Sequence, residues 1–472
     1  MNPAKRLWKC AFLLGIVLAA VTGCSSYKEQ IAAYRMAYSA GDMTSAGEKI
    51  AELVEDNAGE DHGRDTLPVL LEAGTLFRTA GQFRMSQQMF ARAEKTYDYW
   101  QNMARFSLSR EGISLLTNPA TLPYRGSGAD ILMLNTYQAL NALTLGDIQG
   151  ARQPLMRLYT HQQEVVADNA ERIAKTREAT EKSKDSAAID QTAKSNQAAE
   201  VTEKMMARLP DTRGYELYVN PFATYLRAFY HGYAGVDDAD RETARFEMAR
   251  VAAMAPENRA VRHDLERLQA GNRLPPSVYL FHENGMSPWR KEQEFYLPIY
   301  AGGTLSMVAM ALPTLETDAD CGAFAEIRSG GTRATAELLC DMEAVIAQEY
   351  KNDFPGLLTR AIASATAKAV AAYAANYAAQ QSGDALIQLG TFIATAAYQV
   401  ATNVADTRSW VSLPKHIGVT RLDLPADRRV ALYLNGQRLE TVSLPSQGDV
   451  YVIYLRTMHR GSKPSVQLFR MR

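Results

Sequence analysis

The polar residues that could do chemistry are few, and their spacing favours no catalytic class. The seven histidines show no metal-ligand spacing, and the chain has no HExxH, no Cys-x-x-Cys and no phosphate-binding glycine loop. A Gly-x-Ser-x-Gly nucleophile elbow is also missing. His282 and Glu283 are adjacent, but neighbours on a strand point to opposite faces of a sheet and could not easily act on one atom. We therefore expect a protein that is not an enzyme, without catalytic residues, metal ligands or cofactors.

Cys24 is the residue whose surroundings predict a covalent modification. It follows an apolar segment, 10–21, that is too short to span a bilayer but suits a signal-peptide core. Basic residues precede that segment at Lys5, Arg6 and Lys9. This order resembles the lipobox of bacterial lipoproteins, which implies that residues 1–23 are removed and Cys24 is lipidated, with a secretory signal and a chance cysteine as the alternative. Ser25 in place of Asp implies sorting to the outer membrane, on its periplasmic face.

Composition and charge exclude one class of partner. The chain has 472 residues and a net charge of −1, and loss of the basic signal peptide makes the mature protein more acidic. Because no basic stripe interleaved with aromatic residues is present, we expect no nucleic-acid binding. The anchor implies the membrane as a partner, held by about 0.8 kcal/mol per buried methylene of acyl chain. Cys321 and Cys340 could form a disulfide in an oxidising compartment, or remain two separate thiols.

Residues 24–272 are predicted to be almost wholly helical, with apolar residues at three-and-four spacing. Within them a pattern of small and aromatic residues has the spacing of the tetratricopeptide repeat, a pair of antiparallel helices. Its best copy consists of Gly74, Phe77, Gly81, Phe90 and Ala93. Weaker copies lie around Gly41, Gly146 and Ala244 at uneven intervals. Stacked pairs of this kind present a concave surface that holds a peptide or partner helix, although packing alone produces the same pattern.

A polar segment interrupts this helical part. Between about 162 and 209 the composition shifts to Ala, Glu, Lys, Gln and Ser, with few large apolar residues. Such a segment has high helix propensity but little with which to build a core. We predict one or two long solvated helices that project from the body, with disorder as the alternative.

Residues 273–472 are predicted to form an α+β domain. Segment 354–405 is so rich in alanine, with one polar break, that it predicts a helical hairpin. Its scattered Lys, Arg and Gln residues favour packing on a sheet over insertion into a bilayer. Residues 415–472 alternate apolar and polar residues around an Asn435-Gly436 turn, which predicts a small antiparallel sheet or sandwich similar to an immunoglobulin-like module. The predicted fold class is mainly α, a tetratricopeptide-like helical solenoid followed by this α+β part.

Two short motifs lie where predicted elements meet. The first is a Glu-x-Gly-x-x-Pro element made by Glu283, Gly285 and Pro288. The second, 405–414, reads Ala-Asp-Thr-Arg-Ser-Trp-Val-Ser-Leu-Pro, and a bidentate pair of Asp406 with Arg408 beside a buried Trp410 would lock the junction of the hairpin with the β end. Both motifs resemble those of a family of uncharacterised bacterial lipoproteins with a tetratricopeptide-like N-terminal half. The resemblance implies a role in the cell envelope and brings no catalytic residue.

Three functions follow from these expectations. The first is a membrane-anchored periplasmic scaffold in envelope assembly or maintenance, whose repeats bind another envelope protein and which needs no active site. The second is a cell-envelope hydrolase in which Glu283, Asp406 and Arg408 converge in a cleft. The third is a homo-oligomeric ring built on the Ala-rich hairpin. The position of Glu283 relative to 406–410 in the fold separates the second function from the first.

Overall fold

The computed structural model describes most of the chain after residue 26. The described residues are 27–57, 62–106, 119–182, 185–215, 220–301, 304–319 and 321–472. Cys24 and the predicted signal peptide lie outside them. Thirteen α-helices and eleven strands occur among the described residues, and the strands all follow residue 276. The prediction of a mainly helical chain with a sheet-rich C-terminal part is therefore confirmed.

The first helices form three pairs, and the two helices of each pair are joined by a turn of the same backbone geometry. The pairs are α2 (Tyr27–Ala40) with α3 (Met43–Asp56), α4 (Thr66–Thr79) with α5 (Phe83–Phe106), and α7 (Gly128–Thr144) with α8 (Arg152–Glu181). Gly41, Gly81 and Gly146 stand at the turns with φ of +79°, +77° and +79°, in the left-handed region that favours glycine. At each turn the N–H groups of the glycine and of the next residue donate to carbonyls three and five positions earlier. These three glycines thus end their helices with one geometry.

Shorter helices complete the helical part. They are η1 (Pro119–Thr121), α9 (Ser186–Ala193), α10 (Asn196–Met206), α11 (Pro221–Ala234), α12 (Asp238–Met254) and α13 (Arg259–Gln269). Asn220 caps α11 by accepting from the N–H of Ala223 at 3.0 Å, and Pro221 follows it at the first helical position.

The strands form two sheets and one long hairpin. The first strands are β1 (Ser277–Asn284), β2 (Trp289–Ala301), β3 (Thr304–Glu316), β4 (Glu326–Ser329), β5 (Thr332–Thr335) and β6 (Glu337–Asp341). The later ones are β7 (His416–Asp423), β8 (Arg429–Leu434), β9 (Gln437–Ser443), β10 (Val450–Thr457) and β11 (Ser465–Arg470). The five-stranded sheet has the order β11-β10-β1-β7-β6, the four-stranded sheet the order β5-β4-β8-β9, and β2 pairs with β3.

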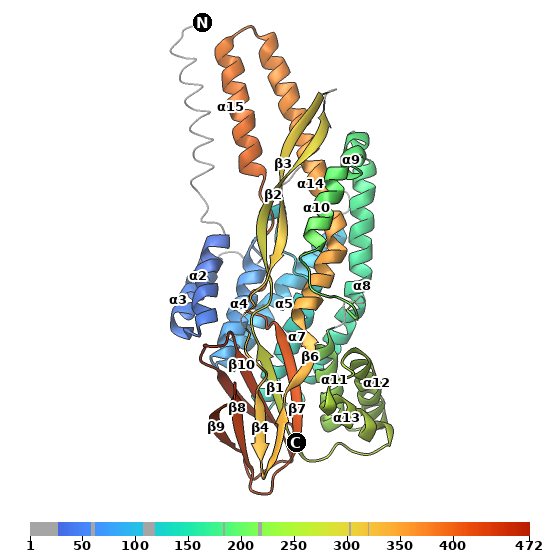
Figure 1. The fold of residues 1–472 in the computed structure, drawn as a ribbon, viewed down its shortest axis with the longest axis vertical. Helices are drawn as coiled ribbons and strands as arrows, with labels where there is room; N and C mark the ends of the chain where they lie inside the picture. The colour runs from blue at the N-terminus through green and yellow to red at the C-terminus, as the bar shows by residue number, and fades with distance from the viewer. Residues whose placement is uncertain are drawn as a thin grey trace.

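The five-stranded sheet is the middle layer of the fold. Its central strands β1 and β10 are parallel to each other and buried at every residue. One face, with Val278 and Ile453, packs on the four-stranded sheet, and the other, with Tyr279 and Tyr454, packs on the helices that stand above the sheets in Figure 1. The β-rich end is therefore not a separate sandwich as expected, because β1 and β6 complete its sheet. Local patterns cannot show a parallel pairing between segments so far apart in the chain.

The Ala-rich hairpin consists of α14 (Met342–Gln381) and α15 (Ala385–Thr402). Phe354 and Leu358 on the first half of α14 are buried with Phe295 and Leu297 of β2. α15 and the end of α14 project beyond the body at the top of Figure 1. The predicted packing on a sheet is wrong for α15, because β2 and β3 form a two-stranded ribbon too narrow to cover both helices. None of the described helices combines the length and the apolar character that crossing a membrane requires.

Two helices of the polar segment of the sequence do not project. α9 and α10 lie against β2 and α14, where Ile189, Val201 and Met205 are buried in one apolar cluster. The prediction of projecting solvated helices is therefore wrong for these two helices. A few apolar residues at helical spacing make a stripe that bulk composition does not reveal.

Candidate functional site

Trp410 of the second motif is buried against the helical part. It packs on Phe90 and Tyr137, with ring centroids 5.8 and 5.7 Å away. Its indole N–H donates to Thr75 Oγ1 on α4 at 2.9 Å and to Ser412 Oγ at 3.1 Å. A buried indole N–H that has such partners fixes the position of the ring. The loop that carries the motif is thereby held on α4 and α5.

Arg408 makes the bidentate pair that its sequence context suggested. Its Nε and Nη2 atoms donate to the two carboxylate oxygens of Asp406 at 2.8 and 2.7 Å. Nη1 donates to Asp65 Oδ1 and to the carbonyl of Arg64, both at 3.1 Å, so the same guanidinium also holds the start of α4. Only 4% of Arg408 is exposed. A charge so well paired and so deeply buried is available for structure rather than for a substrate.

Glu283 of the first motif is also used inside the protein. Its carboxylate accepts from the hydroxyl of Tyr137 at 2.9 Å and lies 3.8 Å from Nε of Arg456. Arg456 in turn donates to the carbonyl of Gly285 at 2.6 Å and to that of Ser412 at 3.1 Å, so one buried cation contacts both motifs. Glu283 and Trp410 thus share the neighbour Tyr137, but both are buried and neither belongs to a surface patch.

Glu72 on α4 completes this arrangement. Its Oε1 accepts from the backbone N–H of Val411 at 2.6 Å. Burial raises its pKa to about 7, against the effect of that N–H, because the charged form loses its hydration. We call Glu72, Glu283, Arg408, Trp410 and Arg456 the joint, since they connect α4 and α7 to the β part.

The remaining residues of the first motif shape the backbone beside the joint. Gly285 has a φ of +75°, and a Cβ there would lie 2.9 Å from Cβ of Lys415 and 3.0 Å from Cβ of Cys321. Only glycine suits such a place. Cys321 and Cys340 are both free thiols, the second of the two alternatives that the sequence left open. Burial raises the pKa of Cys340 far above its usual range, so this thiol is inert.

The inner face of the helix pairs is covered by the chain itself. Every residue of α7 from Ala129 to Leu143 is buried, as is nearly all of α4. At the end of α4 the carbonyls of Arg78 and Thr79 accept from Gln467 and Ser465 of β11 at 2.9 and 2.7 Å. The concave surface expected to hold a partner is therefore filled by the β part.

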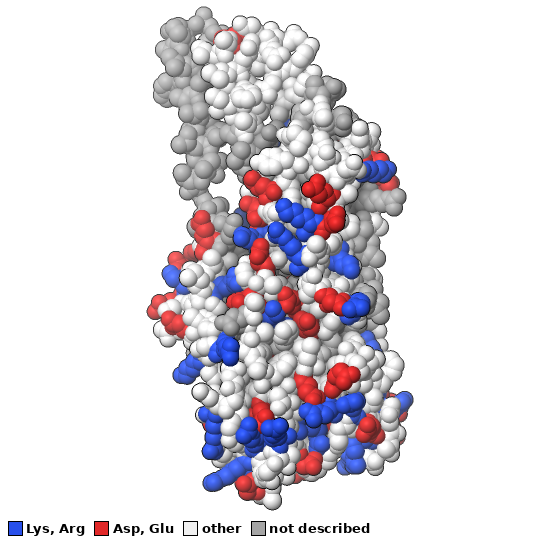
Figure 2. Space-filling view, in the orientation of Figure 1, with Lys and Arg blue, Asp and Glu red and all other residues white. Residues whose placement is uncertain are grey.

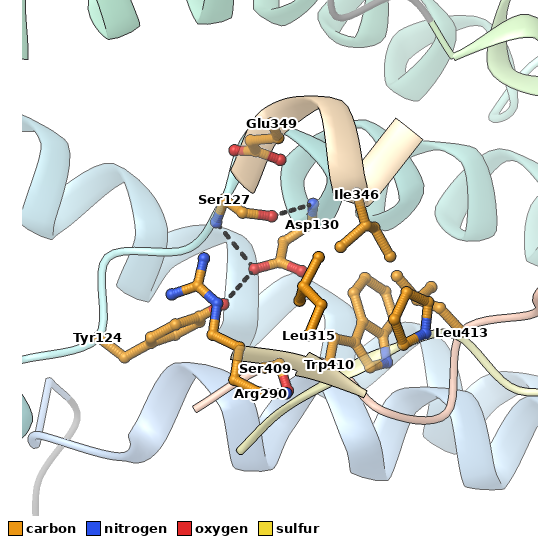
Figure 3. Close-up of a pocket in the computed structure, with 11 residues that line it drawn as sticks. Tyr124, Ser127, Asp130, Arg290, Leu315, Ile346, Glu349, Ser409, Trp410 and Leu413 are labelled. Atoms are coloured by element: carbon orange, nitrogen blue, oxygen red, sulfur yellow. Dashed lines mark hydrogen bonds between the residues drawn. The ribbon is translucent and has the colours of Figure 1, made fainter. Parts of the chain in front are cut away.

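One small pocket opens beside the joint, and Figure 3 shows its lining. Its empty volume is about 390 Å³, including the part open to solvent. Both motifs reach it, through Pro288 and through Ser409 with Trp410, whereas Glu283 and Arg408 are not among its lining residues. The polar residues that line it are Tyr124, Ser127, Asp130, Arg290, Glu349 and Ser409.

The acids of this pocket are held by the start of α7. Ser127 caps α7 in a capping box with Asp130, whose Oδ2 also accepts from Tyr124 at 2.6 Å. Glu349 of α14 accepts from the N–H groups of Gly128 and Ala129 at 2.6 and 3.1 Å. Burial and the nearby Asp353 nevertheless raise the pKa of Glu349 to about 7. A carboxyl that titrates near neutrality could exchange a proton, so this is the group in the pocket best suited to chemistry.

Two other clusters of titratable residues have structural explanations. His282 accepts from the N–H of Ala325 and bonds the hydroxyl of Thr457, and burial, with Arg456 nearby, lowers its pKa to about 3. The ring is therefore neutral at pH 7 and does not act with Glu283. Asp341, Glu343 and His416 bring ligand atoms within 4.8 Å of one another in the described part of the chain. Nζ of Lys415 lies 2.9 Å from Glu343 and supplies a positive charge at that place.

The sequence indicated part of the joint and missed the rest. Asp406, Arg408 and Trp410 were noticed because an ion pair and an indole adjoin the end of a helix. Arg456 is a lone cation after six apolar residues of a strand, which was a usable signal. Glu72 gave none, since a glutamate in a helix is ordinary. No family model, curated protein or solved structure matches this chain.

Proposed function

We propose that this protein is a lipid-anchored lipoprotein of the periplasmic face of the outer membrane, and that it acts as a scaffold for another envelope protein without catalysing a reaction. The helix pairs are then a degenerate tetratricopeptide-like array. The observation that carries the proposal is the joint, in which the charged residues of both motifs are paired inside the protein. Groups used in this way hold a shape and leave little for substrate chemistry.

The outer helices offer the surface for a partner. Ion pairs connect α8 to two other outer helices: Arg157 pairs with Glu94 of α5, and Arg152 pairs with Asp240 of α12. Each of these helices exposes large apolar side chains. They are Tyr99 and Met103, Met156 and Tyr159, and Phe246. Exposed apolar residues rimmed by ion pairs are typical of protein-binding surfaces.

Photo-crosslinking in cells tests this proposal. A photoreactive amino acid is placed at Met156 or at Phe246, with a control at Leu439 on β9, which is also exposed. We expect one envelope protein to be captured from both outer-helix positions and not from Leu439. Recovery of this chain alone from Met156 and Phe246 under several growth conditions contradicts the scaffold function.

A second candidate function is an envelope hydrolase, and the pocket around Glu349 is the observation that favours it. Glu283 and Arg408, its expected residues, are buried and do not line this pocket, so the candidate now depends on the carboxyl of Glu349. Purified protein and its Glu349→Gln variant are incubated with peptidoglycan, and soluble fragments are measured. Release by the unmodified protein that Glu349→Gln abolishes supports the hydrolase, and absence of release from both removes it.

A further inference from the structure

One end of the molecule is almost free of charge. It comprises the described residues of 295–315, from β2 and β3, and of 361–405, from α14 and α15, and we call it the uncharged end. The first segment contains no Asp, Glu, Lys or Arg, and the second contains Lys368 and Asp384, whereas 22% of the whole chain is charged. Figure 2 shows this end as a white surface above a band of mixed blue and red atoms. The change is abrupt, since Glu294 is exposed and directly precedes the first segment.

The uncharged end exposes large apolar side chains instead of burying them. Leu386 is 80% exposed and Phe392 is 63% exposed, both on α15. On the ribbon, Tyr296 and Met307 are 60% and 62% exposed and share the face opposite to the buried Leu297. Further exposed apolar residues of this end are Leu305, Tyr373, Tyr377, Ile387, Leu389, Ile393 and Tyr398. A patch of this kind in a monomer marks a binding surface.

The start of the described chain points toward this end. Gly41, after the end of α2, lies close to the β part, because a Cβ there would be 3.2 Å from the backbone N of Lys463. Arg35 lies over the ring of Trp289, with Cζ 3.1 Å from its centroid. Tyr27, the first residue of α2, therefore lies at the end of this helix that is farther from the sheets. Both α2 and β2 run roughly along the long axis in Figure 1.

Element lengths show how far the uncharged end reaches beyond the anchor. From Arg35 to Tyr27 the helix rises about 12 Å, and Cys24 extends at most about 11 Å further. From Trp289, whose ring lies under the guanidinium of Arg35, β2 extends about 40 Å to Ala301. Because the ribbon extends farther than these lengths together, its tip lies beyond the start of α2 along the long axis.

We propose that the uncharged end is a lipid-binding surface that enters the leaflet in which Cys24 is anchored. This inference rests on the proposed lipidation of Cys24, which places the bilayer surface near the start of α2. Apolar side chains at the depth of the acyl chains lose contact with water. Tyr296 and Tyr398, near the start of 295–315 and the end of α15, suit the level of the headgroups. The protein then stands upright, with the joint and the outer helices held away from the bilayer.

Two charged residues lie within the uncharged end. Asp384 lies at the turn between α14 and α15 and accepts from the N–H of Leu386 at 2.9 Å, so it caps α15. Lys368 is partly buried, and burial lowers its pKa from the usual value because the charged form loses hydration.

Vesicle flotation without the lipid anchor tests the inference. The mature chain, 24–472, carries Cys24→Ala and is mixed with vesicles of phosphatidylethanolamine and phosphatidylglycerol. We expect it to float with the vesicles, and we expect Leu386→Lys with Phe392→Lys to reduce the bound fraction by roughly tenfold or more. Leu439→Lys, at a residue 37% exposed on β9, is the matched control and leaves binding unchanged. Circular dichroism and thermal unfolding establish that the variants are folded, since all three residues are exposed.

Several outcomes overturn the inference. They are failure of the Cys24→Ala protein to float, flotation that the two lysines do not reduce, and an equal loss with Leu439→Lys. Light scattering separates a further outcome: if the lysines convert an oligomer into a monomer and no vesicle binding occurs, a second copy of the chain covers this surface. Fatty-acid labelling of Cys24 in the unmodified protein is read independently, so failure of the anchor and failure of the lipid surface are distinguishable.

Discussion

Trp410 donates its indole N–H to Thr75 across 335 positions of the chain, and this bond joins a loop of the C-terminal part to the middle of α4. The two residues belong to the joint and its surroundings, where both sequence motifs converge. Helical and β parts share one hydrophobic cluster there, with Leu71 and Phe90 from the helices and Val452 from the sheet. This hydrogen bond therefore lies in the core shared by the helical and β parts.

Replacement of Trp410 tests how much the joint stabilises the fold. Trp410→Ala leaves a cavity beside Phe90 and Tyr137 and should lower the free energy of unfolding by about 3–5 kcal/mol. Trp410→Phe retains most of the volume but loses the bond to Thr75, for a loss of about 1–2 kcal/mol. Phe246→Ala, on the surface, is the control and should change it by less than about 0.5 kcal/mol. Urea unfolding measures all three, and equal values for Trp410→Ala and Phe246→Ala contradict the account.

Arg408 should be needed for the same reason. Arg408→Met leaves Asp65 and Asp406 without their shared cation and should cost about 3–5 kcal/mol of unfolding free energy. Adding Asp406→Asn to that variant should recover part of the loss, because one uncompensated charge is removed. Arg245→Met is the comparison, since Arg245 pairs with Glu242 on the surface at 2.7 Å and should contribute less than about 1 kcal/mol. Similar losses for Arg408→Met and Arg245→Met would show that the buried pair is unimportant.

Gly74 allows α4 and α5 to approach. A Cβ on Gly74 would overlap the ring of the buried Phe90. We expect Gly74→Ala to lower stability by about 1–3 kcal/mol through overpacking. Gly47 on α3 has nothing within 4 Å of such a Cβ, so Gly47→Ala should raise stability by about 1 kcal/mol through helix propensity. Thermal unfolding of both variants measures the difference, and shifts of the same sign would be inconsistent with the close crossing.

Glu72 should make stability depend on pH. Its pKa is about 7 in the folded protein and 4.5 in the reference state. Between these two pH values the folded protein keeps the proton on Glu72, whereas the unfolded chain has lost it. The protonated Glu72 contributes on the order of 3 kcal/mol to the free energy of unfolding. This contribution is complete below pH 4.5 and is lost as the pH rises through 7. Glu72→Gln still accepts from Val411 but does not titrate. The fall in unfolding free energy between pH 5 and pH 8 should be larger for the unmodified protein than for Glu72→Gln, and identical falls would contradict the assignment.

The sequence predicted local features better than contacts between residues that are far apart in the chain. Gly41, Gly81 and Gly146 end helices because a left-handed residue is required there, and this requirement is visible in the chain itself. The partners Arg456 and Gly285 are separated by 171 positions, and their bond depends on the parallel pairing of β1 with β10. No local pattern encodes that register.

Two larger predictions failed for a related reason. The helical pattern correctly indicated paired helices, but whether their inner face is open depends on where the β part lies. Likewise the alanines of α14 and α15 predicted a helical hairpin. How far this hairpin extends beyond the body depends on how much of it the β2–β3 ribbon can cover. Both are properties of packing between distant segments, which composition and periodicity do not contain.

The anchor at Cys24 is the central claim of the proposed function, and fatty-acid labelling tests it most directly. Cells that produce the unmodified protein or Cys24→Ala are grown with a labelled fatty acid, and the protein is isolated after separation of the membranes. The account predicts label on the unmodified protein in the outer-membrane fraction and none on Cys24→Ala. An unlabelled protein, or equal label on both, would contradict it.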